Sequence, residues 1–236
     1  MLGSEKSEDR CSGKDDTARG RSMRSVRRWP EDPLAHRALL DYMERLPVSP
    51  SAEQTTSSLL NGNGLDFAGS DLSGLDLVGA ELSGSAMDRV LLVGVDLYTA
   101  WLASAQLSEA DLGGADLRKV QGRGCHARYA KLCDADMQRA DFSQSDLLGA
   151  DLRRARLRRA SFSGSDLRDA DLRECGFDRT RLSGARLAGC AVDGASGLVI
   201  GPVDIGVACP DLLDGPELLD WFTSNGAVDV EVRQPA

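Results

Sequence analysis

Residues 105–119 read AQLSE ADLGG ADLRK, three pentapeptides in succession with a leucine at the centre of each. Steps of five residues in both directions reach a large apolar residue at every centre from Phe67 to Val192, except at Gly122 and Ala127. The residue two places before each centre is uncharged and mostly small, and the residue one place before it is commonly Asp or Glu. One unbroken period of five therefore organises the middle of the chain.

A period of five matches neither the 3.6-residue period of a helix nor the two-residue period of a strand. It fits a square coil in which each pentapeptide forms one side. The centre and the small residue two places before it then point inward, and the other three residues face water. Residues 65–195 are expected to form about 6.5 coils, stacked at about 4.8 Å into a rod roughly 30 Å long.

This A(D/N)Lxx pattern resembles that of the pentapeptide-repeat family over residues 65–195. The resemblance implies an all-β solenoid, specifically a right-handed quadrilateral β-helix. Some members of the family bind DNA gyrase and related topoisomerases as mimics of duplex DNA, and protect these enzymes from quinolones or other inhibitors. In relatives of the quinolone-resistance type, the C-terminal segment also makes a homodimer.

The segments on either side of the repeat have different compositions. The polar residues 1–31 predict a disordered tail, and residues 48–64 a linker. Residues 32–47 predict a short amphipathic helix with Asp32 as N-cap and Pro33 at its first position. Residues 196–236 predict a C-terminal capping segment with a short helix over 216–222, because an open coil end exposes apolar interior and unpaired backbone.

Composition argues against several classes of protein. The formal net charge is −9, no apolar run is long enough to span a bilayer, and the start of the chain lacks a signal-peptide core, so a cytoplasmic location is expected. The six cysteines form no Cys-x-x-Cys pair and only two histidines occur. We therefore expect reduced thiols, no metal or cofactor, no catalytic residues and no small-molecule substrate.

The function is then expected to depend on surfaces. Residues 65–116 hold nine Asp or Glu against Arg89 alone, whereas residues 117–195 hold more Lys and Arg than acids. We single out three candidate partner-binding sets: an acidic half (Asp71, Asp76, Asp96, Asp111, Asp116), a basic column two places after the centre at intervals of twenty (Lys119, Arg139, Arg159, Arg179), and an apolar patch (Leu91, Val93, Tyr98, Trp101). Each set has an alternative interpretation: the charged sets as ordinary solvated faces, the patch as a surface covered by the N-terminal helix.

Two functional hypotheses follow. The first is a DNA mimic that binds gyrase, favoured by the acidic half. The second is a scaffold that binds partner proteins through faces of opposite charge, favoured by the basic half, which a DNA-binding groove would repel. Separately, Gly122 and Ala127 remove two large core residues, which predicts a kink or a weakly packed coil, with a functional hinge as the alternative.

Overall fold

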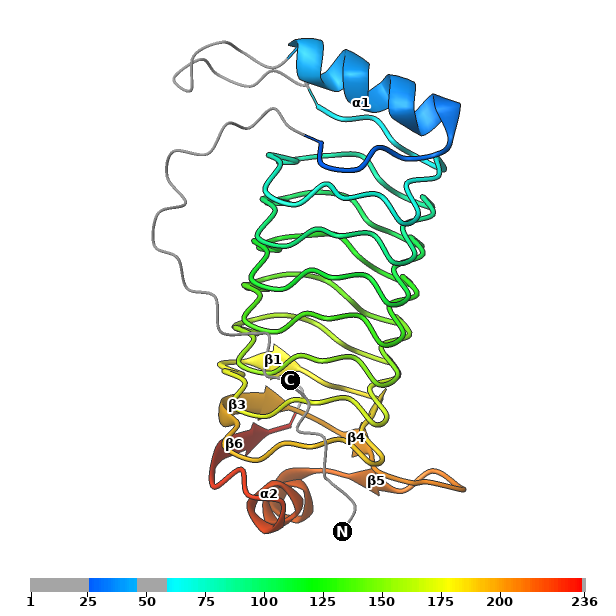
Figure 1. The fold of residues 1–236 in the computed structure, drawn as a ribbon. Coiled ribbons are helices and arrows are strands. Elements are labelled where there is room, and N and C mark those ends of the chain that lie inside the picture. The colour runs from blue at the N-terminus through cyan, green and yellow to red at the C-terminus, as the bar shows by residue number, and fades with distance from the viewer. Residues whose placement is uncertain (1–25, 46–58, 235–236) are drawn as a thin grey trace, which may run out of the picture.

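The computed structural model describes residues 26–45 and 59–234, so most of the predicted tail and linker lie outside the described residues. A long stack of coils carries one helix at one end and strands with a second helix at the other (Figure 1). The elements are α1 (Pro33–Arg45), β1 (Thr180–Arg181), β2 (Ala185–Arg186), β3 (Ser196–Ile200), β4 (Val203–Asp204), β5 (Leu212–Leu213), α2 (Gly215–Ser224) and β6 (Asp229–Arg233).

Backbone hydrogen bonds join successive coils along the whole repeat and pair residues that are twenty apart. Parallel bridges run from Asn61↔Glu81 to Gly176↔Ser196 without a missing side. On a typical side, the amide of Leu92 donates to the carbonyl of Asp111 at 2.7 Å. The residue two places after the centre has a positive φ on every side described, which favours glycine there, although other residues such as Arg139, with φ 61°, also adopt it. Because each side turns a corner after five residues, the period of five follows from the backbone.

The predicted inward register is confirmed. The centre residues are fully buried, as with Leu152 at 0% exposed, and so are the small residues two places before them, as with Ala150. Where the small residue is a serine, its hydroxyl donates to a backbone carbonyl, as Ser165 does to Phe142 at 2.6 Å. The buried hydroxyls therefore cost little, because each has a partner.

The coil continues through the two sides that lack a large centre. The amide of Gly122 donates to the carbonyl of Asp141 at 2.7 Å, as on any other side. A Cβ on Gly122 would lie 3.0 Å from the ring of Phe142, so the phenyl group of the next coil fills the space. Phe142 stacks in turn on Phe162 at 6.1 Å between ring centroids. The missing side chain is compensated by its neighbours along the rod.

Helix α1 lies across the N-terminal end of the stack (Figure 1). Its residues Ala35, Leu39 and Tyr42 are buried in the same hydrophobic core as the coils. The Tyr42 hydroxyl donates to the carbonyl of Asp76, and burial raises the pKa of Tyr42. The preceding segment pairs with the edge of the first coil, since the amide of Asp71 donates to the carbonyl of Arg28 at 2.8 Å. This end is therefore closed by both apolar and backbone contacts.

At the C-terminal end the five-residue repeat stops, and short strands and helix α2 cover the last coils. Strand β3 pairs in parallel with β1 and β6, and β4 pairs with β2 and, antiparallel, with β5. Asp214 caps α2 at its N-terminus, and Leu218 and Phe222 of α2 are fully buried. The Phe222 ring meets Phe177 edge-on at 6.0 Å between centroids, which joins the helix to the last coils.

A charge placed inside the coil should abolish cooperative folding. We expect Leu152→Arg to eliminate the thermal unfolding transition, because an unpaired buried charge costs several kcal/mol, a large part of a domain's stability. Ala191→Arg adds the same charge at an exposed position and should change stability by no more than about 0.5 kcal/mol. Circular dichroism melts of the two variants measure the difference, and equal melting curves would contradict the register.

Candidate interaction surface

The four sides of the coil make four faces, and two of them carry most of the predicted residues. We call the sides centred on 77, 97, 117, 137, 157 and 177 the Asp76 face, and those centred on 72, 92, 112, 132, 152, 172 and 192 the Asp71 face. Asp76, Asp96 and Asp116 lie on the Asp76 face, joined by bridges one coil apart, whereas Asp71 and Asp111 lie on the Asp71 face. The predicted acidic half is therefore divided between two faces.

Each aspartate of the Asp76 face closes a small hydrogen-bonded turn. Asp96 Oδ1 accepts the amide of Tyr98 at 3.0 Å, and Asp76 and Asp116 do the same for the amides two places after them. Burial raises the pKa of Asp96, and the charges of Asp116 and Asp76 raise it further. Asp136 extends this acidic ladder by one coil. It was not among the predicted residues, although its place twenty after Asp116 is the signal that finds it.

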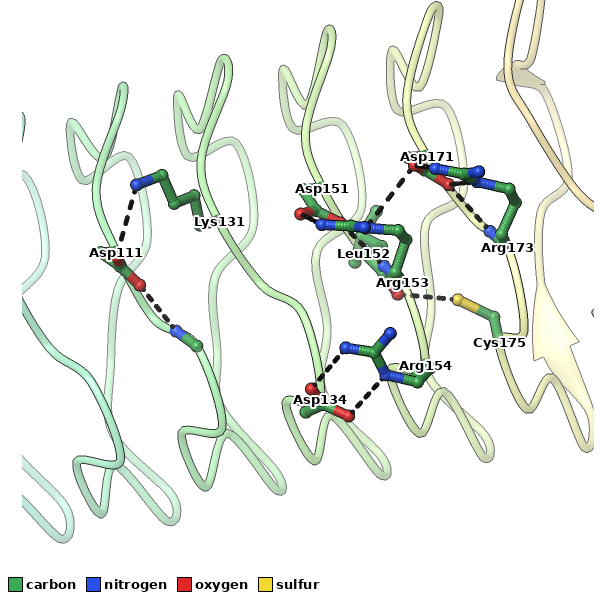
Figure 2. Close-up of polar contacts among 11 residues, drawn as sticks. Asp111, Lys131, Asp134, Asp151, Leu152, Arg153, Arg154, Asp171, Arg173 and Cys175 are labelled. Carbon is green, nitrogen blue, oxygen red and sulfur yellow. Dashed lines mark hydrogen bonds and ion pairs between the residues drawn. The ribbon is translucent and has the colours of Figure 1, made fainter. Parts of the chain in front are cut away.

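Cross-coil ion pairs neutralise the acids toward the C-terminal end. Asp111 pairs with Lys131 at 3.5 Å, and Asp136 pairs with Arg156 at 3.4 Å. Figure 2 shows this arrangement on the Asp71 face, where the guanidinium of Arg153 lies between Asp151 and Asp171 of successive coils. The Asp76 face itself ends in Arg156 and Gly176. Neither of these two faces is therefore acidic along its full length.

The predicted basic column lies along one corner of the Asp76 face. All four residues have positive φ, between 57° and 63°. Lys119 donates to the hydroxyl of Tyr98 and lies 4.8 Å from the centre of its ring. Arg139, Arg159 and Arg179 form no ion pair with any residue that the structure describes, in contrast to the paired arginines around them. The column thus differs from its neighbours Arg118, Arg156 and Arg158, which are ion-paired.

The predicted apolar patch is spread around the coil. Leu91 and Val93 lie on the Asp71 face, Tyr98 on the Asp76 face and Trp101 on the face after it. Val93 remains 45% exposed and Trp101 48% exposed with α1 in place. Helix α1 closes the end of the rod, so the expectation that it covers these residues was wrong. Tyr98 is partly covered by Lys119 and Arg118.

Two buried cysteines are held in the unreactive thiol form. Burial raises the pKa of the Cys125 thiol to about 11 and that of the Cys175 thiol to about 12, which keeps both protonated at neutral pH. The thiol of Cys175 donates to the carbonyl of Leu152 (Figure 2). Among the described residues, no three His, Cys, Asp or Glu come together as metal ligands. Neither helix of the described chain is long and apolar enough to cross a bilayer.

The repeats identify the family. A model described as pentapeptide repeats matches eight copies over residues 63–98, 102–139, 135–174 and 160–196. The chain belongs to the pentapeptide-repeat family, whose fold is a right-handed quadrilateral β-helix. No curated protein sequence matches the chain.

Several solved pentapeptide-repeat structures are similar to this chain at low sequence identity. HetL of the cyanobacterium Nostoc sp. strain PCC 7120, involved in heterocyst differentiation regulation, is 23% identical with a TM-score of 0.52, covering 62% of this chain and 79% of HetL. QnrB1, a plasmid-mediated fluoroquinolone resistance protein, is 20% identical with a TM-score of 0.40, covering 71% and 77%. A protein of the Arabidopsis thaliana thylakoid lumen is 19% identical with a TM-score of 0.21, covering 70% and 78%.

Two aspartates at the same place in the repeat should respond to neutralisation with opposite signs. The raised pKa of Asp96 means that its charge opposes folding above the ordinary Asp value of 3.8. Asp96→Asn should therefore raise the melting temperature at pH 7. The hydrogen bond from Arg168 lowers the pKa of Asp166, so its charge favours folding above 3.8, and this contribution is lost as the pH falls through the lowered value.

Asp166→Asn should accordingly lower the melting temperature at pH 7. Both differences should shrink toward pH 3, where the carboxyl groups take up protons. Melting curves of the two variants and the wild type between pH 3 and pH 7 test the assignment. Shifts of the same sign at pH 7 would contradict it.

Proposed function

We propose that this chain is a non-enzymatic scaffold that binds partner proteins through opposite charges at the two ends of one face. The carrying observation is the Asp76 face, where Asp76, Asp96 and Asp116 are followed by an uncompensated column of Arg139, Arg159 and Arg179. Such a division suits two contacts of opposite charge, because charge complementarity favours the correct partner and repels the wrong one. The expected setting is the cytoplasm.

A gyrase-binding DNA mimic is the second candidate. Its support is the ladder of Asp76, Asp96, Asp116 and Asp136, whose carboxylates repeat at one coil, about 4.8 Å. A phosphate backbone likewise presents regularly spaced negative charge. The ladder ends at Arg156, however, and the arginines beyond it would be repelled by a positively charged DNA-binding groove. The charges of this face therefore fit a scaffold better than a DNA mimic. In that role the chain would protect gyrase from inhibitors, as in antibiotic resistance or self-resistance.

A homodimer through the C-terminal segment is compatible with either function. Strand β6 is the last strand of its sheet, where it pairs with β3. Val228, immediately before β6, is 68% exposed. A second copy that pairs with β6 would cover both the free strand edge and this side chain.

Two sets of substitutions separate the contacts of the scaffold. In affinity capture from the native cell, Asp76→Lys, Asp96→Lys and Asp116→Lys together should release one set of partners. Replacement of Lys119, Arg139, Arg159 and Arg179 by Gln should release another set and flatten the salt dependence of its binding, because fewer charges are neutralised on association. The Gln variant should be as stable as the wild type or more so, since like charges about 5 Å apart are removed. Unchanged capture by both variants would contradict the scaffold.

Gyrase supercoiling tests the second candidate directly. Under the mimic hypothesis, micromolar protein alters supercoiling, and reversal of Asp71, Asp76, Asp96, Asp111 and Asp116 to Lys removes the effect. Under the scaffold proposal, the wild type leaves the reaction unchanged. The variant with Gln at Lys119, Arg139, Arg159 and Arg179 is the control, because it changes surface charge on the Asp76 face without touching the acids. If the wild type alters supercoiling and the acidic reversal abolishes this effect, the scaffold proposal is wrong and the mimic hypothesis takes its place.

A further inference from the structure

A hollow of about 260 Å³ opens on the Asp76 face near the C-terminal end of the rod. Gly176 lies in its wall, and Arg156 and Arg158 line it together with Ser196. A Cβ on Gly176 would meet nothing within 4 Å, so the open space extends over this residue. Since one water occupies about 30 Å³ of the liquid, the hollow has room for a small anion with attached waters.

The hollow lies where the acidic ladder stops. On the four preceding sides of this face, an aspartate accepts the amide two places further along, from Asp76 with Val78 at 3.1 Å to Asp136 with Gln138 at 3.2 Å. The next two sides carry Arg156 and Gly176 in place of the aspartate, and neither side chain can accept. The backbone amides of Arg158 and Asp178 consequently have no hydrogen-bond partner among the residues that the structure describes.

Electrostatics at the hollow favours an anion. Arg156 and Arg158 line it, and the unpaired Arg139, Arg159 and Arg179 occupy the adjacent corner of the same sides. The opposing charges are Asp136, which pairs with Arg156 at 3.4 Å, and Asp178, which pairs with Arg158 at 2.9 Å. Both arginine side chains are more than half exposed, so these pairs are weak and an incoming anion can compete for them.

We propose that this hollow binds the phosphate group of a small soluble ligand. The two open amides lie one coil apart, about 4.8 Å, a separation that two oxygens of one tetrahedral anion can bridge. The guanidinium groups of Arg156 and Arg158 and the hydroxyl of Ser196 supply further donors to the remaining oxygens. The phosphate takes the place that the missing carboxylates hold on the rest of the face. This site is independent of the scaffold function.

Nuclear magnetic resonance of the full-length ¹⁵N-labelled chain tests the site at the two amides themselves. Inorganic phosphate is titrated at constant ionic strength, with chloride as the reference salt. The amide resonances of Arg158 and Asp178 should shift and saturate with phosphate and stay in place with chloride. A parallel titration with phosphoserine identifies the source: equal affinity assigns the hollow to phosphate alone, and tighter binding assigns it to a phosphate monoester.

Gly176→Asp is the decisive variant, because it restores the carboxylate that the rest of the face carries. The new side chain should accept the amide of Asp178 and weaken phosphate binding by at least about tenfold. Ala191→Asp is the matched control, since it makes the same change of charge at the same place in the repeat on the Asp71 face. Binding to this control should equal that of the wild type.

A second pair of variants keeps the test valid if Gly176→Asp fails to fold. Arg156→Gln should also weaken binding, whereas Arg128→Gln, which removes a paired arginine outside the hollow, should not. Phosphate shifts that fail to saturate, that appear equally with chloride, or that persist unchanged in Gly176→Asp and Arg156→Gln would overturn the site. A single-stranded oligonucleotide whose binding shifts other amides and survives both variants would assign anion binding to the column instead.

Discussion

The narrow interior of the coil is the constraint on which the rest of the structure depends. Two inward residues on each side must fill a space bounded by four backbone segments, so one is large and apolar and the other small. Packing of that density leaves no room for an unpaired charge. The outward positions carry no such restriction, and every feature of functional interest in this chain lies on them. The proposed contacts thus use residues that do not fill the core.

The interior could be predicted from the sequence because its rule repeats. A charged residue at an inward position would break the pattern, and no inward position from Phe67 to Val192 carries one. Even the interruption at Gly122 was visible, but not its remedy, because the ring of Phe142 that fills the space belongs to the next coil. Sequence spacing gives the face on which a residue lies; the packing between coils requires the structure.

The surface was predictable only in part. The column from Lys119 to Arg179 followed from intervals of twenty, and the structure shows that Arg139, Arg159 and Arg179 lack ion pairs in the part of the chain it describes. The pairing of other charges, such as Asp136 with Arg156, was not predictable, because a long side chain can form ion pairs of similar free energy with several neighbours. The place of α1 was also beyond the sequence, since an apolar helix face fits an open coil end as well as an exposed patch. The hollow at Gly176 was not predicted from the sequence, because it lies where Arg156 and Gly176 replace the aspartate of the preceding sides.

Helix α1 has a consequence for assembly as well as for stability. A stack of coils is open-ended by construction. Without α1 and the segment before it, the first coil would present free backbone groups and apolar interior at one end, while β6 presents a strand edge at the other. Two such ends are complementary to each other, and a head-to-tail contact between unlike ends does not close on itself. The product would be a filament that lengthens by one molecule at a time. The thirteen residues of α1, with the segment before it, cover one of the two ends that such a filament would need.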